Sequence, residues 1–168
     1  LAISRFYPQT RCAIELGGQD AKMIFFRTND KGDIEVADMR MNGSCAGGTG
    51  AFIDEMAKLM GVGTESGEFE QLASRGTTVH EVSGRCGVYA KTDIQPLLNE
   101  GARPEDVAAS IFQAVVTQTI SGLACGRPIR GNVAFLGGPL QYLSELRHRF
   151  YLTLNLDEEH RIVPQNAH

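Results

Sequence analysis

The sequence predicts one α/β domain over residues 1–168, in which a five-stranded mixed sheet carries helices on its faces. Three observations lead to this prediction. The first forty residues alternate short β-rich runs with turn signals, which is typical of an antiparallel meander. The stretch from residue 104 to residue 123 has the apolar periodicity of a core helix. An apolar run at residues 132–136 then opens a strand–helix–strand unit.

The three strands of the meander are predicted at residues 12–16, 22–27 and 34–39. The first is short and apolar and runs directly into Gly17-Gly18. Between the second and the third, Asn29-Asp30-Lys31-Gly32-Asp33 is a strong turn signal. The third strand alternates with period two, so two successive hairpins are expected.

Helices are predicted in the middle of the chain. A glycine-rich loop over residues 42–50 leads into a helix whose apolar spacing begins at Phe52, and a short helix is expected at residues 65–74. Thr92 or Asp93 is predicted to cap a further helix, which would end at Gly101.

The clearest helix opens at Pro104, because proline and two acidic residues stand in its first turn. Its wide apolar stripe consists of Val107, Ala108, Ile111, Phe112, Val115, Val116, Ile120 and Leu123. After the strand at residues 132–136, a helix is expected from Leu140 to about Phe150, and a last strand at residues 161–164.

Composition narrows the classes of function. Lysine and arginine number 16 and aspartate and glutamate 20, so the formal net charge is −4. A mildly acidic chain without a basic block is a poor candidate for binding nucleic acid through phosphate contacts. The longest apolar runs are a handful of residues, so no membrane partner is expected. Because the chain starts at Leu1 and stops at His168 directly after a strand-like stretch, we expect it to be a domain of a longer protein.

The four cysteines, at positions 12, 45, 86 and 125, form no CxxC pair, which argues against a zinc ribbon or a thioredoxin-like site. Without a secretory signal they fit the reducing cytoplasm. Cys12 and Cys125 have apolar neighbours and are expected to be buried, packed thiols. Cys45 and Cys86 each stand just ahead of a predicted helix, where a thiolate is stabilised; inert thiols in turns are the alternative.

Two double glycines follow predicted strands, Gly17-Gly18 and Gly137-Gly138. Glycine at a strand exit lets a ligand approach the backbone and offers N–H groups to phosphate oxygens, although two tight turns explain the pattern equally simply. Gln19-Asp20 favours a binding role, because a carboxylate beside a phosphate loop can hold magnesium and an amide can orient a water molecule. The glycine-rich loop adds a helix N-terminus, whose first N–H groups lack partners.

Four motifs over residues 11 to 150 stand in an order seen in one family. They are Ile14-Glu15-Leu16-Gly17-Gly18-Gln19-Asp20-Ala21-Lys22, residues 42–54 around Cys45, Arg85-Cys86-Gly87-Val88-Tyr89-Ala90-Lys91-Thr92-Asp93, and Phe135-Leu136-Gly137-Gly138-Pro139-Leu140. Together they resemble the ATP-dependent activators of 2-hydroxyacyl-CoA dehydratases, which are related to the ATPase subunits of benzoyl-CoA reductase. The sequence looks most like the activase domains of very long multidomain members.

The resemblance implies the fold of acetate and sugar kinases, chaperones and actin, in which an RNase H-like domain is duplicated around a nucleotide cleft. Family members carry an earlier phosphate loop in the first half, and this chain has no such motif. The resemblance therefore implies that residues 1–168 are the second, C-terminal half only. Glu15 departs from the aspartate usual in short members, and Lys91 occupies a place that is often acidic or polar.

The resemblance also implies site residues and cofactors. Gln19 would orient the attacking water, and Asp20 would help to hold Mg2+. ATP would be lined by Gly17, Gly18, Gly47, Gly48, Thr49, Gly50, Gly137, Gly138 and Pro139. Cys45 and Cys86 from each of two subunits would bind one shared 4Fe-4S cluster, so these two cysteines are expected to be spatial neighbours.

The implied function is an iron–sulfur electron-transfer activator, in which ATP hydrolysis drives one low-potential electron into a partner acyl-CoA dehydratase or reductase. It would act in the cytoplasm as a homodimer or as a paired activase domain. The isolated chain, with half of the cleft, is expected not to hydrolyse ATP at a useful rate. Two alternatives stay open: a sugar- or acetate-kinase-like half-domain, and a non-catalytic interaction module of a large protein.

Overall fold

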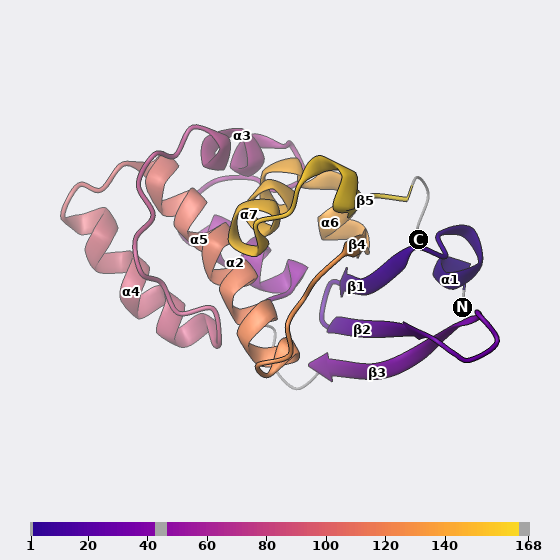
Figure 1. Ribbon diagram of the computed structural model, residues 1–168. Coiled ribbons are helices and arrows are strands. Elements are labelled where there is room, and N and C mark those ends of the chain that lie inside the picture. The colour runs from indigo at the N-terminus through magenta and orange to yellow at the C-terminus, as the bar shows by residue number, and fades with distance from the viewer. Residues whose placement is uncertain (1, 43–46, 165–168) are drawn as a thin grey trace.

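A five-stranded mixed sheet forms the centre of the computed structural model, which describes residues 2–42 and 47–164 (Figure 1). Its order is β3-β2-β1-β4-β5. The strands are β1 (Thr10–Leu16), β2 (Ala21–Thr28), β3 (Ile34–Asn42), β4 (Asn132–Leu136) and β5 (Arg161–Ile162). The three strands of the meander are antiparallel, whereas β4 pairs parallel with β1 and places Phe135 opposite Ile14. The predicted five-stranded mixed sheet is confirmed.

Six of the helices gather on one side of the sheet, and α1 lies apart from them (Figure 1). The helices are α1 (Ala2–Phe6), α2 (Gly50–Leu59), α3 (Glu68–Ser74), α4 (Gly87–Asn99), α5 (Pro104–Thr119), α6 (Gly138–Tyr142) and α7 (Ser144–Leu154), with a π turn η1 (Ile120–Ala124) and a 3-10 turn η2 (Glu158–His160). The main core lies between this helical layer and the sheet, and a smaller apolar cluster covers the other sheet face, where Ile3 of α1 packs.

The central helix α5 forms as its sequence pattern predicts. Pro104 opens it, and Glu105 and Asp106 stand in the first turn, where acidic side chains favour the helix dipole. Phe112 is fully buried and meets the Phe69 ring edge-on at 5.2 Å. The segment Pro104–Ala124 is long and apolar enough to cross a bilayer, but 67% of its most apolar window is buried inside the domain, which is typical of a core helix.

Several element boundaries differ from the prediction. α4 begins at Gly87, so Thr92 and Asp93 lie inside the helix and do not cap it. The Asp93 carboxylate instead accepts a hydrogen bond from the backbone N–H of Ser83 at 2.8 Å. The helix predicted from Leu140 onward is two helices, because Leu143 adopts an extended conformation between them. The last strand ends at Ile162.

The two cysteines expected to be packed thiols have different surroundings. Cys12, on β1, is buried with 1% of its surface exposed, as predicted. The prediction for Cys125 is wrong, because this residue is exposed. It follows the π turn in a left-handed conformation, with φ of 46°, which turns the chain out of the helix before the loop to β4.

Candidate functional site

The two double-glycine turns lie beside each other at one edge of the sheet. Because β1 and β4 are parallel neighbours, Gly17 and Gly137 follow the same ends of adjacent strands. A Cβ atom on Gly137 would overlap the carbonyl oxygen of Leu16, and its φ is +89°. Only glycine allows this close approach of the two strand exits.

The start of α2 completes the group. The N–H of Gly50 donates to the carbonyl oxygen of Gly17 at 3.0 Å, and that of Ala51 donates to the Gly18 carbonyl at 2.8 Å. A Cβ atom on Gly50 would also lie 3.1 Å from Cγ of Pro139. The structure therefore brings together the three glycine segments singled out from the sequence.

These hydrogen bonds correct one expectation about the helix N-terminus. The first N–H groups of α2 were expected to lack partners, but those of Gly50 and Ala51 are bonded to the β1–β2 turn. The turn presents its two carbonyl oxygens to the positive end of the helix, which satisfies donors that would otherwise be orphaned. The helix end thus fixes the turn, and the N–H groups of Gly50 and Ala51 are not available to an anion. The backbone N–H groups of the turns themselves are candidates for that role.

A cavity of about 710 Å³ opens beside the three segments. Its lining residues are Gly18, Gln19, Gly50, Ala51, Ile53, Asp54, Thr64, Glu65, Gly67, Glu70, Gly138, Pro139, Tyr142 and Leu143. The turns supply one wall, and the α3 region and α6 supply the other. Sequence reasoning missed Glu70 and the exposed ring of Tyr142, since no local motif links them to the glycine turns.

Gly18 and Gly138 differ from the other glycines of this cavity. A Cβ atom added to either would have no neighbour within 4 Å, and neither φ is left-handed. Packing against the rest of the chain therefore does not require glycine at these two positions, and both line the cavity. Glycine there keeps the backbone open to a ligand.

Two carboxylates and a lysine form a charged group next to the β1–β2 turn. The ammonium of Lys22 lies 3.1 Å from Oδ2 of Asp20 and 3.5 Å from Oε1 of Glu15. Its hydrogen bond to Asp20, followed by the charge of Glu15, raises the pKa of Lys22. A cation therefore already stands between two carboxylates, and oxygen ligands of this kind are those that Mg2+ prefers. The donor set fits a magnesium ion that would compete with Lys22.

Gln19 and Asp20 occupy different positions in this turn. Gln19 is exposed and lines the cavity, whereas Asp20 is half-buried and its carboxylate folds back over Gly17. A Cβ atom on Gly17 would overlap Oδ1 of Asp20, so glycine leaves room for that carboxylate. The roles of both residues in binding or catalysis stay predictions.

Cys86 stands at the start of α4, directly before Gly87, and is half-buried. The backbone ahead of it packs closely against the glycine-rich loop, because a Cβ atom on Gly47 would overlap the carbonyl oxygens of Gly84 and Arg85. Cys45 lies outside the described residues, so its predicted pairing with Cys86 stays a prediction.

The connection that leads to Cys86 is fixed by buried side chains of α5. The carboxylate of Asp106 accepts hydrogen bonds from the N–H groups of Thr77 and Thr78 at 2.8 and 3.0 Å. These bonds hold the pKa of Asp106 below its ordinary value. Further along, the hydroxyl of Ser110 accepts a hydrogen bond from the N–H of His80 at 2.8 Å.

Lys91, which departs from the pattern of short family members, has a partner in the structure. Its ammonium lies 2.6 Å from Oε1 of Glu55 on α2. The ion pair joins the helix that begins after the glycine-rich loop to the helix that begins after Cys86. The position is thus used to hold α4 against α2.

Comparison with known proteins agrees with this geometry. The family model described as the BadF/BadG/BcrA/BcrD ATPase family matches residues 1–148. The 2-hydroxyisocaproyl-CoA dehydratase activator of Clostridioides difficile is 33% identical over 131 residues, which cover 78% of this chain and 47% of that protein. The chain therefore spans about half the length of such relatives.

Solved structures show the same fold. The activator of the 2-hydroxyisocaproyl-CoA dehydratase from Clostridium difficile with bound ADPNP superimposes with a TM-score of 0.80 at 29% identity, over 98% of this chain and 57% of that one. The ethanolamine utilization protein EutJ from Carboxydothermus hydrogenoformans, at 12% identity, covers 99% of this chain and 48% of its own with a TM-score of 0.51, which shows the fold alone. The predicted actin-like ATPase fold class is confirmed. The chain belongs to the BadF/BadG/BcrA/BcrD ATPase family.

Proposed function

We propose that this chain is the C-terminal half of an ATP-dependent iron–sulfur activator, which transfers one low-potential electron to a partner acyl-CoA dehydratase or reductase in the cytoplasm. Membership of the family supports the proposal, as do the activators among its relatives. Their greater length, of which the chain spans about half, supports the assignment to one half of a duplicated fold.

The glycine turns are the proposed phosphate site. Gly17, Gly18 and the Gly137-Gly138-Pro139 turn lie at adjacent strand ends, and Thr49 and Gly50 begin the helix that braces them. Gly47 and Gly48 do not line the cavity of this chain, and they would complete the loop around the bound nucleotide. Backbone N–H groups at turns of this kind bind phosphate oxygens without a side chain in the way. The other half of the cleft would hold the rest of the ATP.

Gln19 and Asp20 are the proposed hydrolytic residues. The exposed amide of Gln19 can hydrogen-bond a water molecule and align it with the terminal phosphate. The carboxylate of Asp20, with Glu15 nearby, would hold Mg2+ once Lys22 moves aside. The bound ion would neutralise phosphate charge.

The observation that carries the iron–sulfur proposal is the packing of Gly47 against Gly84 and Arg85. In the sequence, Cys45 is two residues from Gly47, and Cys86 directly follows Arg85. We therefore expect the two cysteines most suited to a shared ligand set to lie near each other. Cys86 stands at the positive end of the 13-residue helix α4.

Thiolates are the ligands that fit a 4Fe-4S cluster, which would supply one-electron redox chemistry. Such a cluster takes four thiolates, and Cys45 and Cys86 supply two. We therefore propose that two copies of this chain, or two activase domains of one protein, share the cluster across a two-fold axis. This arrangement uses the cysteines, which a kinase-like half-domain would leave unused.

Anaerobic reconstitution with iron and sulfide tests the proposal. Wild-type chain is expected to acquire brown charge-transfer absorption, and Cys45→Ser and Cys86→Ser are expected to abolish it. Cys125→Ser is the matched control, because Cys125 is an exposed thiol outside the proposed ligand set. Colourless wild-type protein, or loss of colour in Cys125→Ser alone, would contradict the proposal and favour the kinase-like half-domain or the interaction module.

A further inference from the structure

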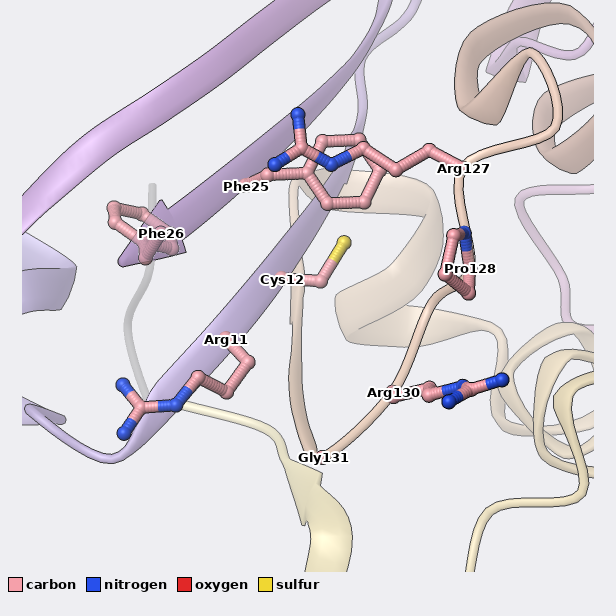
Figure 2. A pocket seen from close by; sticks show the side chains of 8 residues that line it. All are labelled: Arg11, Cys12, Phe25, Phe26, Arg127, Pro128, Arg130 and Gly131. Carbon is pink, nitrogen blue, oxygen red and sulfur yellow. The ribbon is translucent and has the colours of Figure 1, made fainter. Parts of the chain in front are cut away.

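A second cavity lies at the end of the sheet opposite the glycine turns. It has a volume of about 390 Å³ and lies between β1, β2 and the loop that joins η1 to β4. β1 and β4 begin here, at Thr10 and Asn132, whereas the glycine turns follow their other ends. Its lining residues are Arg11, Cys12, Phe25, Phe26, Arg127, Pro128, Arg130 and Gly131 (Figure 2). We name this cavity the arginine pocket.

Irregular backbone shapes the arginine pocket. The pairing of β1 with β4 shifts register at Arg11, and the pairing of β2 with β3 shifts between Phe25 and Phe26. Such bulges re-aim side chains. Gly131 has φ of +75°, and a Cβ atom there would lie 3.1 Å from Cγ of Arg11. Glycine therefore lets the loop pass close to the base of the Arg11 side chain.

The charge around the pocket is positive and largely uncompensated. No acidic residue is among its lining residues. Within residues 2–42 and 47–164, the guanidinium groups of Arg11 and Arg130 have no hydrogen bond or ion pair to another side chain or to the backbone. Arg127 has one carboxylate partner, Asp38, at 3.2 Å. This concentration of cations belongs to a chain whose net charge is −4.

The floor of the pocket is apolar. Phe25, on β2, is buried, and the guanidinium of Arg127 stacks over its ring at 4.6 Å. Figure 2 shows the sulfur of Cys12 directed into the space between Phe25 and Pro128. Burial raises the pKa of Cys12 to about 12, so this thiol is neutral. An uncharged floor below a cationic rim is complementary to an organic anion.

We propose that the arginine pocket binds a small organic phosphate, whose apolar part lies on this floor and whose phosphate oxygens are bound by Arg11, Arg127 and Arg130. A guanidinium group can donate a pair of hydrogen bonds to the oxygens of one phosphate. Because a phosphate monoester is a dianion and a carboxylate a monoanion, a site with several cations favours the phosphate. Arg11 and Arg130 extend to opposite sides in Figure 2. Because neither has a partner to lose, both can turn toward a bound phosphate.

Phenyl phosphate is the probe that tests this proposal, with amide chemical shifts of the 168-residue chain as the readout. Titration is expected to move the amides of Gly131 and Arg127 saturably, whether or not the Gly18 amide, which reports binding at the glycine turns, also shifts. Inorganic phosphate, which lacks the apolar part, is expected to bind at least about tenfold more weakly, and phenylacetate likewise. If inorganic phosphate bound as tightly as phenyl phosphate, the apolar floor would not contribute to binding. If phenylacetate bound as tightly, the pocket would not be selective for phosphate over carboxylate.

Two substitutions locate the site, and a third controls for charge. Arg11→Gln and Arg130→Gln are each expected to weaken phenyl phosphate binding about tenfold, the loss of one charge-assisted hydrogen bond. Arg75→Gln is the control, because Arg75 is exposed at the end of α3 and lies outside the pocket; it is expected to bind like wild type. Arg127 is left intact because it packs on Phe25.

Three results would overturn the proposal. The first is no saturable binding of phenyl phosphate up to about 10 mM, well above the range of useful small-molecule sites. The second is binding that perturbs the glycine turns in place of Gly131. The third is an equal loss of affinity in the Arg75 variant, which would reduce the effect to net charge.

Discussion

Substituting Gly138 by alanine separates folding from ligand binding at the glycine turns. Gly138 is the first residue of α6, its φ is not left-handed, and a Cβ atom added to it would have no neighbour within 4 Å. Alanine restricts the unfolded chain, which is worth about 0.4–1 kcal/mol, but a residue with a Cβ is disfavoured in a helical conformation directly before Pro139. Because these effects oppose each other, the free energy of unfolding is expected to change by less than about 1 kcal/mol. The same methyl group would stand where a phosphate approaches the backbone, and the loss of one charge-assisted hydrogen bond, about 1.5–3 kcal/mol, weakens ATP binding roughly 10- to 100-fold.

The neighbouring Gly137 supplies the contrast. Its φ is +89° and a Cβ would overlap the Leu16 carbonyl, so Gly137→Ala is expected to destabilise the fold by more than about 1–2 kcal/mol, the cost of the left-handed conformation alone. Urea denaturation gives the stability, and calorimetric titration with ATP gives the affinity. Gly138→Ala with wild-type ATP affinity, or with a loss of stability as large as that of Gly137→Ala, would refute the reasoning that glycine at Gly138 serves a ligand.

Three further predictions concern a carboxylate, a pair of thiols and turnover. Hydrogen bonds from the backbone lower the pKa of Asp106 in the folded chain, so this carboxylate stabilises the fold at pH values above its ordinary pKa. That stabilisation is lost as the pH falls through the lowered pKa of the folded chain. Asp106→Asn should therefore flatten the acidic part of a stability–pH profile measured by urea denaturation. Iodoacetamide at pH 8 should label exposed Cys125 in the folded chain, whereas buried Cys12, with a pKa of about 12, should react only after unfolding, which peptide mass analysis reports. The chain alone should show no useful ATP hydrolysis by phosphate release; turnover that disappears in Gln19→Ala would contradict the half-cleft proposal.

The sheet could be predicted because its signals are local. Alternation and turn residues in the first forty positions define the meander, and the parallel partner at residues 132–136 has the apolar pattern of a buried strand. The start of α4 could not be predicted in this way, because tertiary contacts determine where this helix begins. Gly87 packs against Glu55 of α2, and Asp93 is drawn to the backbone of Ser83, so neither residue signals the boundary locally.

The site shows the same division. The glycine segments were identified from their motifs, but the wall formed by Glu70 and Tyr142 was not, because these residues meet the turns only through the packing of α3 and α6. Apolar neighbours suggested that Cys125 is buried, yet the π turn and its left-handed backbone place it outside the core. The arginine pocket likewise depends on register shifts in the pairing of β1 with β4 and of β2 with β3, which leave no local sequence pattern.

The loop before α2 gives the proposed coupling between ATP and the thiols a short physical route. At one end Gly50 donates its N–H to the Gly17 carbonyl in the proposed phosphate site, and at the other end Gly47 packs on the carbonyls of Gly84 and Arg85, directly before Cys86. Four consecutive residues therefore touch both sites. The ion pair of Glu55 with Lys91 joins the two helices that begin on either side of this loop. A displacement of the β1–β2 turn on hydrolysis would thus be transmitted to the start of α4 through backbone contacts. These contacts are close-packed, because Gly47 and Gly50 have no side chain that could rearrange and absorb the displacement.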